Sequence, residues 1–200
     1  MNKAIIVIFV ISFKIKAQEF HIGSQIWARK NLDVSIYRNG DTIQQIKEGS
    51  SWANLSVGAW CYYENKSAND TTYGKLYNWF AVNDPRGIAP VGFHVPTIGE
   101  WKILSDYLGG DSIAGQKMKS NYGWKNNGNG TNSIGFEGLA GGLRYSFGNF
   151  SAVGAHCYWW SSSEGNISSA WLRILDYNCD ILKSNTCYKQ SGFSVRCLRD

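Results

Sequence analysis

The sequence lacks any apolar run long enough to cross a membrane, and it has few charged residues. Its longest apolar stretch, residues 4–13, is about half of the roughly 20 residues that a membrane-spanning helix needs, so an integral membrane protein is excluded. Charged residues make up 18% of the 200 residues and hydrophobic residues 44%. Disordered chains show the opposite balance, and this length fits one globular domain with its own core.

The familiar signatures of catalysis and metal binding are missing too. The chain contains no HExxH, GxSxG, phosphate-binding or dinucleotide-binding motif. No cysteine pair has the CxxC spacing of zinc sites, and the histidines are scattered, at His21, His94 and His156. The tetrapeptide GDSI at 110–113 resembles the GDSL signature of serine esterases, but a nucleophilic serine needs a strand before it, whereas Ser112 follows an expected helix end. Asp111 is expected to cap the next helix. We therefore expect no catalysis, no cofactor and no metal ion.

Residues 1–17 have the pattern of a signal peptide. A short basic start precedes the apolar stretch, and Ala17 is a small residue suited to the cleavage position. We expect cleavage after Ala17, export to the cell surface, the medium or the periplasm, and one mature domain at 18–200; a buried N-terminal strand is the alternative. Losing three lysines with this segment lowers the formal net charge from +5 to about +2. No basic cluster that would follow phosphates remains, so nucleic acid is not expected as a partner.

All five cysteines lie in the expected mature chain, at Cys61, Cys157, Cys179, Cys187 and Cys197. Export would place them where disulfides persist. An odd number leaves one thiol over, and about 15 arrangements of two bridges remain open from the sequence alone.

Helices are expected over residues 73–82, 97–108 and 111–119. The first has apolar residues at helical spacing and is followed by Pro85, which stops a helix. The second begins at a capping box formed by Thr97 and Glu100. His94, just before this box, is expected to be a hydrogen-bonded structural histidine.

Strands are expected over residues 25–32, 59–63, 158–162, 171–177, 180–183 and 192–198. Because side chains alternate across a strand, Trp159 and Trp160 must point to opposite faces, and one of them is free to face solvent. In the last strand, Phe193 and Cys197 share an apolar face that excludes Arg196. Together these elements predict an α+β protein.

Six motifs follow one another along the chain in an order that resembles a known family. They are AWCYYEN at 59–65, YGKLYNWFAVNDPRGIAP at 73–90, GFHVPTIGEWKILSDYLGG at 92–110, GNGTNSIGFEGLAGGLRY at 128–145, YWWSSSE at 158–164 and GFSVRCLRD at 192–200. This pattern is similar to the Fibrobacter succinogenes major paralogous domain and covers nearly all of residues 20–200. The resemblance implies an exported bacterial domain without an established biochemical role. It also implies a C-type-lectin-like α+β fold, with two main helices packed on short antiparallel strands and much irregular loop, similar to formylglycine-generating enzymes and retroelement-diversified binding proteins.

The same resemblance implies a binding module whose ligand, a glycan or a surface protein, contacts residues 171–191. The candidate contacts are Tyr177, Asn178, Asp180, Lys183, Asn185 and Lys189, with Trp159 nearby if it faces outward. Two alternatives stay open: an enzyme on a formylglycine-generating-enzyme-like scaffold, and a structural module of an envelope assembly.

The sequence lacks motifs that formylglycine-generating enzymes and calcium-dependent lectins share, so neither the oxidase chemistry of the former nor the calcium site of the latter is expected. Cys179 and Cys187 do not match the closely spaced cysteine pair of the formylglycine-generating enzymes, and the EPN, QPD and WND motifs of calcium-dependent lectins are absent. The resemblance favours a disulfide between Cys61 and Cys197, because both lie in motifs typical of the family. Cys157, Cys179 and Cys187 would then supply one further bridge.

Overall fold

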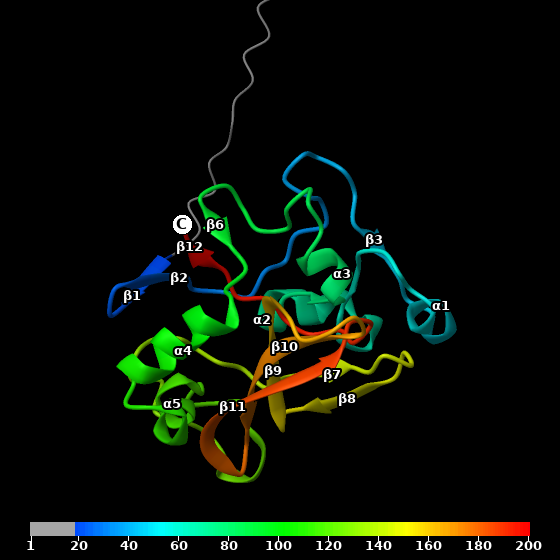
Figure 1. Cartoon of the computed structure of the whole chain (residues 1–200). Coiled ribbons are helices and arrows are strands. Elements are labelled where there is room, and N and C mark those ends of the chain that lie inside the picture. The colour runs from blue at the N-terminus through cyan, green and yellow to red at the C-terminus, as the bar shows by residue number, and fades with distance from the viewer. Residues whose placement is uncertain (1–18) are drawn as a thin grey trace, which may run out of the picture.

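The computed structural model describes residues 19–200, so the expected signal peptide and its cleavage site lie outside the described residues. Three β-sheets and several short helices make up this part of the chain, which confirms the predicted α+β class (Figure 1). Within residues 19–200, no helix is both long enough and apolar enough to cross a membrane.

The first sheet joins the two ends of the described chain. Its strand order is β1 (Glu19–Ile22), β2 (Gln25–Ala28), β12 (Leu198–Arg199) and β6 (Phe93–His94). Neighbouring strands are antiparallel, and Leu198 pairs with Trp27 on one side and His94 on the other. The Arg199 guanidinium also lies 2.8 Å from the Glu19 carboxylate. The last strand is thereby held between two strands that come from distant parts of the chain.

The second sheet has five strands and forms the centre of the molecule. Its order is β11 (Cys179–Tyr188), β10 (Ser169–Asp176), β9 (His156–Glu164), β7 (Gly141–Arg144) and β8 (Phe150–Val153). All neighbours are antiparallel except β7 and β9. The strands predicted from 158, 171 and 180 onward are confirmed, and β11 lies at the edge of the sheet.

The third sheet and several short helices are formed by the chain between β2 and β6, two strands of the first sheet. The strands are β3 (Gln44–Gln45), β4 (Ala59–Cys61) and β5 (Leu76–Tyr77), and the helices are α1 (Gly49–Ala53), α2 (Asp70–Tyr73) and α3 (Trp79–Val82). Single 3-10 turns occur at Tyr63–Asn65, Ser67–Asn69 and Lys125–Asn127.

The single helix predicted over 73–82 is wrong. The chain leaves α2 at Gly74, where φ is +71°, and the residues of β5 then pair with β4. Helix α3 starts afresh because the side chain of Asn78 accepts a hydrogen bond from the N–H of Ala81 at 3.1 Å. Pairing with a distant strand outweighs the helical spacing of the apolar residues here, as tertiary context often does.

The two best-formed helices are α4 (Ile98–Tyr107) and α5 (Asp111–Met118), which confirm the second and third predicted helices. The capping box is present: the Thr97 hydroxyl accepts from the N–H of Glu100 at 3.2 Å, and the Glu100 carboxylate accepts from the N–H of Thr97 at 2.7 Å. The expectation that Asp111 caps α5 is wrong. Gly110 takes the cap position, at φ +100°, and the Asp111 carboxylate instead binds the buried guanidinium of Arg173.

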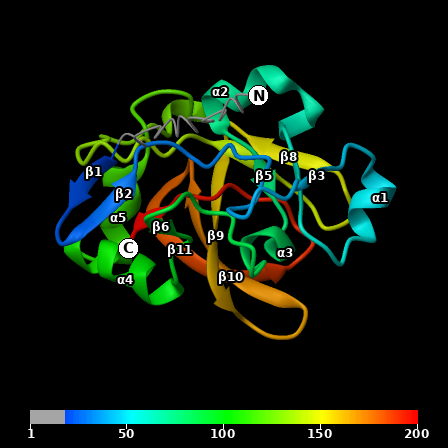
Figure 2. The same ribbon diagram turned by 90° about the horizontal axis from the view of Figure 1, so that it is seen from above.

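Strand β9 separates two hydrophobic clusters. Trp159 packs against Trp101 and Phe136, with ring centroids 5.9 and 5.4 Å away, while Trp160, on the other face, lies 4.5 Å from Phe193. The predicted alternation is confirmed, but both indoles are fully buried, so the expectation that one of them faces solvent is wrong. Figure 2 shows β9 between α4 and α5 on one side and α3 on the other.

The segment before the C-terminus is only partly a regular strand. Of the predicted strand over 192–198, β12 includes only the last residue. The predicted alternation nevertheless holds, because Phe193 and Cys197 join one hydrophobic cluster while Arg196 lies 4.6 Å from the ring of Phe136 in the other.

No disulfide joins the cysteines of residues 19–200. The predicted bridge between Cys61 and Cys197 is therefore wrong, since the two side chains pack in different clusters, and the further bridge among Cys157, Cys179 and Cys187 is absent too. Cys179 and Cys187 lie at opposite ends of β11, about 26 Å apart at roughly 3.3 Å per residue. Burial raises the pKa of Cys61 and of Cys197 to about 12, so these thiols are unreactive near neutral pH.

Candidate functional site

The segment predicted to contact a ligand forms the β10–β11 hairpin. Its exposed or half-exposed candidates are Tyr177, Asn178, Asp180, Lys183 and Asn185. Asp180 lies 3.4 Å from the buried Nζ of Lys119, and Lys183 donates to the Asp176 carboxylate at 3.1 Å. These side chains are polar groups of the hairpin, whose strand β11 packs against α5 near Asp180, and as ligand contacts they stay predictions.

Two other candidates are wrong as ligand contacts because they are buried. Trp159 is fully buried, and its indole N–H donates to Oδ1 of Asn31 at 2.9 Å. Lys189 is 7% exposed. Its ammonium binds the carboxylate of Glu164 and donates to the carbonyl of Ile167 at 3.0 Å. Both polar groups are satisfied inside the fold.

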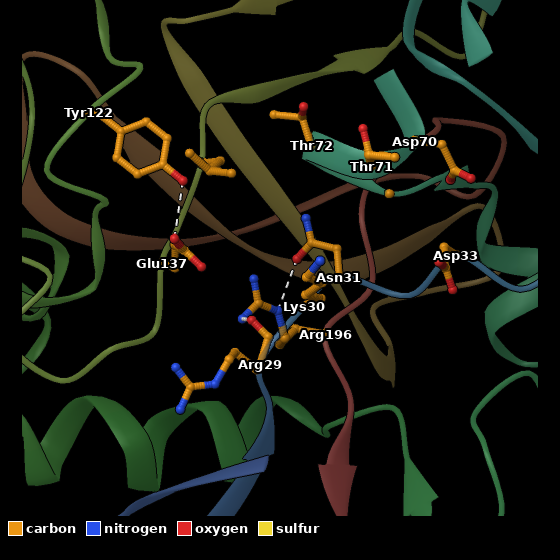
Figure 3. Close-up of a pocket in the computed structure, with 12 residues that line it drawn as sticks. Arg29, Lys30, Asn31, Asp33, Asp70, Thr71, Thr72, Tyr122, Glu137 and Arg196 are labelled. Atoms are coloured by element: carbon orange, nitrogen blue, oxygen red, sulfur yellow. Dashed lines mark hydrogen bonds between the residues drawn. The ribbon is translucent and has the colours of Figure 1, made fainter. Parts of the chain in front are cut away.

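A polar pocket lies on another part of the molecule, beside the loop that follows β2 (Figure 3). Its volume is about 480 Å³, within the range of small-molecule sites. It is lined by Arg29, Lys30, Asn31 and Asp33 of this loop, by the start of α2, and by Tyr122, Glu137 and Arg196. None of its lining residues belongs to the β10–β11 hairpin, so the pocket is separate from the predicted contact segment.

Arg196 is the pocket residue built most deeply into the fold, with 2% of its surface exposed. Its Nε donates to Oδ1 of Asn31 at 3.0 Å, and its Nη1 donates to the carbonyls of Arg29 and Phe136 at 2.8 and 2.9 Å. Burial lowers the pKa of Arg196 to about 10, which still leaves the guanidinium charged at neutral pH. The structure thus holds a cation in one fixed orientation at the pocket.

Asn31 connects this cation to the core. Its Oδ1 accepts from both Trp159 and Arg196, and its Nδ2 donates to the carbonyl of Tyr73 at 2.9 Å. One amide therefore fixes the positions of a core indole, the pocket guanidinium and the end of α2.

Hydroxyl and carboxylate groups line the remainder of the pocket. Figure 3 shows Tyr122 and Glu137 on one side of Arg196, and Thr71 and Thr72 on the other. The Tyr122 hydroxyl donates to Glu137 at 3.1 Å, and the tyrosine ring is 50% exposed. The pocket therefore offers donors, acceptors and one aromatic face within a small space.

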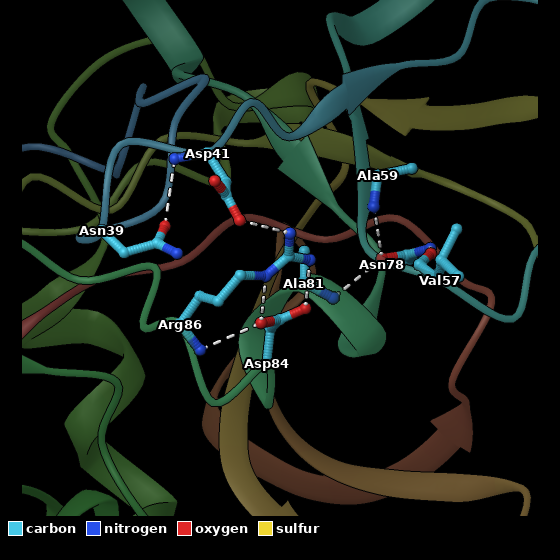
Figure 4. Close-up of polar contacts among 8 residues, drawn as sticks. All are labelled: Asn39, Asp41, Val57, Ala59, Asn78, Ala81, Asp84 and Arg86. Carbon is cyan, nitrogen blue, oxygen red and sulfur yellow. Dashed lines mark hydrogen bonds and ion pairs between the residues drawn. The ribbon is translucent and has the colours of Figure 1, made fainter.

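A second polar cluster, around Arg86, ties loops together. Arg86 donates to the carboxylates of Asp84 at 2.8 Å and Asp41 at 3.1 Å (Figure 4) and lies 4.1 Å from the ring of Tyr37. The bond from Arg86 lowers the pKa of Asp84. Nearby, Asn78 accepts from two backbone N–H groups at 2.9 and 3.1 Å. Arg86 and the two aspartates bond to one another, Asn78 bonds to the backbone, and the depression beside Arg86 is wide open, so the cluster is structural.

His94 is confirmed as a hydrogen-bonded structural histidine. Its Nδ1 lies 2.8 Å from the Asp200 carboxylate and its Nε2 2.9 Å from that of Glu100. Burial opposes the charged ring, but the two carboxylates outweigh burial and raise the pKa of His94. Within residues 19–200, no group of three or more His, Cys, Asp or Glu side chains is arranged so that it could hold a metal ion.

A family model described as the Fibrobacter succinogenes major domain matches residues 20–199. The chain belongs to this family. No curated protein and no solved structure matched the chain.

In this Fibrobacter succinogenes major domain, the pocket residues are those that sequence reasoning missed. They come from five separate segments, and the backbone of Arg29 meets the side chain of Arg196 across 167 positions of sequence. One signal was available: Arg196 is a charged residue between apolar neighbours in an otherwise buried segment. Such a residue needs partners inside the fold, and the search for those partners leads to the pocket.

Proposed function

We propose that this Fibrobacter succinogenes major domain is an exported binding module with a C-type-lectin-like fold, and that it binds a glycan in the pocket of Figure 3. Export is supported by the signal-peptide pattern of residues 1–17. The fold proposal is supported by two main helices packed on antiparallel strands and by long irregular loops.

The composition of the pocket carries the functional proposal. Sugars present hydroxyl groups that both donate and accept hydrogen bonds, and ring faces that pack on aromatic side chains. Thr71, Thr72, Glu137 and Arg196 supply the polar partners. The half-exposed ring of Tyr122 supplies the apolar face.

Binding of the mature chain to an oligosaccharide array tests this proposal. We expect saturable binding, weakened about 2- to 10-fold by Tyr122→Ala, because an aromatic contact contributes about 0.5–1.5 kcal/mol. Tyr107→Ala is the matched control, since Tyr107 is an exposed tyrosine on α4 outside the pocket. An array without signal, or equal losses in both variants, would contradict glycan binding at this pocket.

The bound sugar is expected to be released unchanged, since we propose binding without catalysis. The alternative, an enzyme on a formylglycine-generating-enzyme-like scaffold, predicts a modified product. Chromatography of the bound oligosaccharide after prolonged incubation separates the two, and cleavage or oxidation would favour the enzyme.

A surface-protein ligand at the β10–β11 hairpin is the second candidate. It is favoured by the second half of β11 at the sheet edge, where residues 183–186 are exposed. Unpaired backbone groups at such an edge can accept a strand from a partner. In this case the domain would be a structural module of an envelope assembly. The double variant Tyr177→Ala, Asp180→Ala would then weaken association with the purified partner and leave glycan binding unchanged. Equal partner binding by this variant and the native chain would count against the hairpin.

A further inference from the structure

The buried cation of the pocket has no anionic partner within residues 19–200. Four other buried cations each pair with a carboxylate, in the pairs Arg173–Asp111, Lys119–Asp180, Lys189–Glu164 and Lys75–Asp70. Arg196 is equally buried, but the oxygens that accept its hydrogen bonds, from Asn31 and from backbone carbonyls, are all neutral. A buried charge is normally paired because leaving water is unfavourable, so this guanidinium is available to an anion from outside.

Arg144 shows why Arg196 is unusual. Arg144 is also buried without a carboxylate, but all three of its guanidinium nitrogens donate to backbone carbonyls, at 2.6–2.9 Å. In Arg196, Nε and Nη1 have acceptors, whereas Nη2 has none in the described chain. Arg196 also lines the pocket, and Arg144 does not. One nitrogen of a fixed, charged donor is therefore left for a ligand.

Two further cations stand at the same pocket. Arg29 and Lys30 are exposed, and neither forms an ion pair with residues 19–200. Three carboxylates line the same pocket, those of Asp33, Asp70 and Glu137. Asp70 lies 3.4 Å from a lysine ammonium, and Glu137 accepts from a tyrosine hydroxyl at 3.1 Å. The formal charges of the lining therefore balance, and the attraction for an anion is local to Nη2 of Arg196, which has no acceptor in the described chain.

We propose that the pocket recognises an acidic sugar, with the sugar carboxylate accepting a hydrogen bond from Nη2 of Arg196. This inference rests on the proposed glycan binding and names its substrate class. Arg29 and Lys30 would add attraction at the rim, while Thr71 and Thr72 meet the sugar hydroxyls. Hydrogen bonds between charged groups are about twice as strong as neutral ones, so the carboxylate would be the main determinant of specificity.

The test compares oligogalacturonate with its methyl ester, which has the same sugars without the charges. Calorimetry on the mature chain is expected to give an affinity for the free acid about tenfold higher, or more, than for the ester. The difference should shrink as NaCl rises from about 0.01 M to 1 M, because the screening length falls from about 30 Å to about 3 Å. A sialylated oligosaccharide and its methyl ester form a second probe pair.

Variants locate the effect in the pocket. Lys30→Met is expected to weaken binding of the free acid about 2- to 5-fold, as for an exposed charge pair, and to leave binding of the ester unchanged. Lys47→Met is the matched control, because Lys47 is exposed and outside the pocket. Arg196→Lys keeps the charge but removes Nη2, so it should reduce the preference for the acid to the smaller part that Arg29 and Lys30 supply. If Arg196→Lys fails to fold, Asn31→Asp replaces it, because the new carboxylate would neutralise Arg196 from within.

The outcomes are distinct. Equal affinity for acid and ester, with both weakened about 2- to 10-fold in Tyr122→Ala, would overturn the acidic-sugar inference and leave glycan binding standing. No binding of either member of both pairs, together with an empty array, would overturn both. A glutamate-rich peptide that displaces the oligogalacturonate at a lower concentration would overturn the inference in favour of a protein ligand.

Discussion

Replacing Asn31 by alanine would remove one side chain and leave polar groups on three elements without a partner. The indole N–H of Trp159, fully buried, donates to it at 2.9 Å, and Nε of Arg196, 2% exposed, donates at 3.0 Å. Its own Nδ2 donates to the Tyr73 carbonyl at 2.9 Å. Alanine satisfies none of these groups.

The expected loss of stability follows from those contacts. Each buried donor left without an acceptor costs about 1–3 kcal/mol, which gives about 2–6 kcal/mol for the two donors. Water in the pocket can reach part of this site, because Asn31 itself is only half-buried. We therefore expect the free energy of unfolding to fall by about 2–4 kcal/mol, which corresponds to roughly 5–15 °C in Tm for a domain of this size.

Urea unfolding followed by tryptophan fluorescence measures this loss. Asn178→Ala is the matched control, since Asn178 is an exposed asparagine in the β10–β11 turn, and its change should stay within about 0.5 kcal/mol. A loss below about 1 kcal/mol in Asn31→Ala, or losses equal in the two variants, would refute the role given to Asn31.

Asn31→Asp sharpens the test because aspartate keeps an acceptor oxygen for Trp159 and Arg196 and loses only the donor to the Tyr73 carbonyl. The positive charge of Arg196 should lower the pKa of the new carboxyl below its unfolded value. Its stabilisation is then fully present above the ordinary aspartate pKa and is lost as the pH falls through the lowered pKa. A stability of Asn31→Asp as low as that of Asn31→Ala at neutral pH would show that the acceptor oxygen is unimportant.

Three further predictions concern stability. Thr97→Ala should lower the free energy of unfolding by about 1 kcal/mol through loss of the capping box, whereas Thr97→Ser should retain it; equal values in urea melts would contradict this. The pKa of His94 is raised because two carboxylates outweigh burial. The stabilisation that His94 contributes is therefore complete below the ordinary histidine pKa and is lost as the pH rises through the folded value. Urea melts across this pH window should show the free energy of unfolding decline in the native chain and not in His94→Gln. Gly128→Ala should destabilise the domain by about 1–3 kcal/mol, because the new Cβ would lie 2.1 Å from a backbone oxygen. Gly99→Ala should stabilise it by up to about 1 kcal/mol, because Gly99 lies in α4 and its Cβ would have no atom nearer than 3.8 Å. Thermal melts in which both variants change Tm in the same direction would be inconsistent with this packing.

Elements whose signals lie within a few residues were predictable from the sequence. Helix α4 has its start signal, Thr97 and Glu100, only three positions apart, and the strands β9 and β10 are long and apolar enough to be recognised locally. The helix predicted over 73–82 failed for the opposite reason. Whether residues 73–82 form one helix depends on the pairing of β5 with β4 and on the cap at Asn78. A local sequence pattern shows neither of these.

The pocket could not be assembled from the sequence because its parts meet only in three dimensions. Arg196 and Asn31 are 165 positions apart and nevertheless share a hydrogen bond. The predicted contact segment was chosen by resemblance, which indicated the β10–β11 hairpin but not which side chains face inward. For this reason Lys189 was expected to contact a ligand, although it is a buried cation bound to Glu164.

The tryptophan pair of β9 has a consequence for how the domain comes apart. Trp159 and Trp160 are adjacent in β9 but belong to different hydrophobic clusters. If either cluster opened, one indole would be exposed and the β9 backbone, which also supports the other cluster, would be loosened. The two halves of the interior should therefore melt in a single cooperative transition. Amide hydrogens in the middle of β9 would then exchange with solvent only through global unfolding, making them the slowest in the molecule.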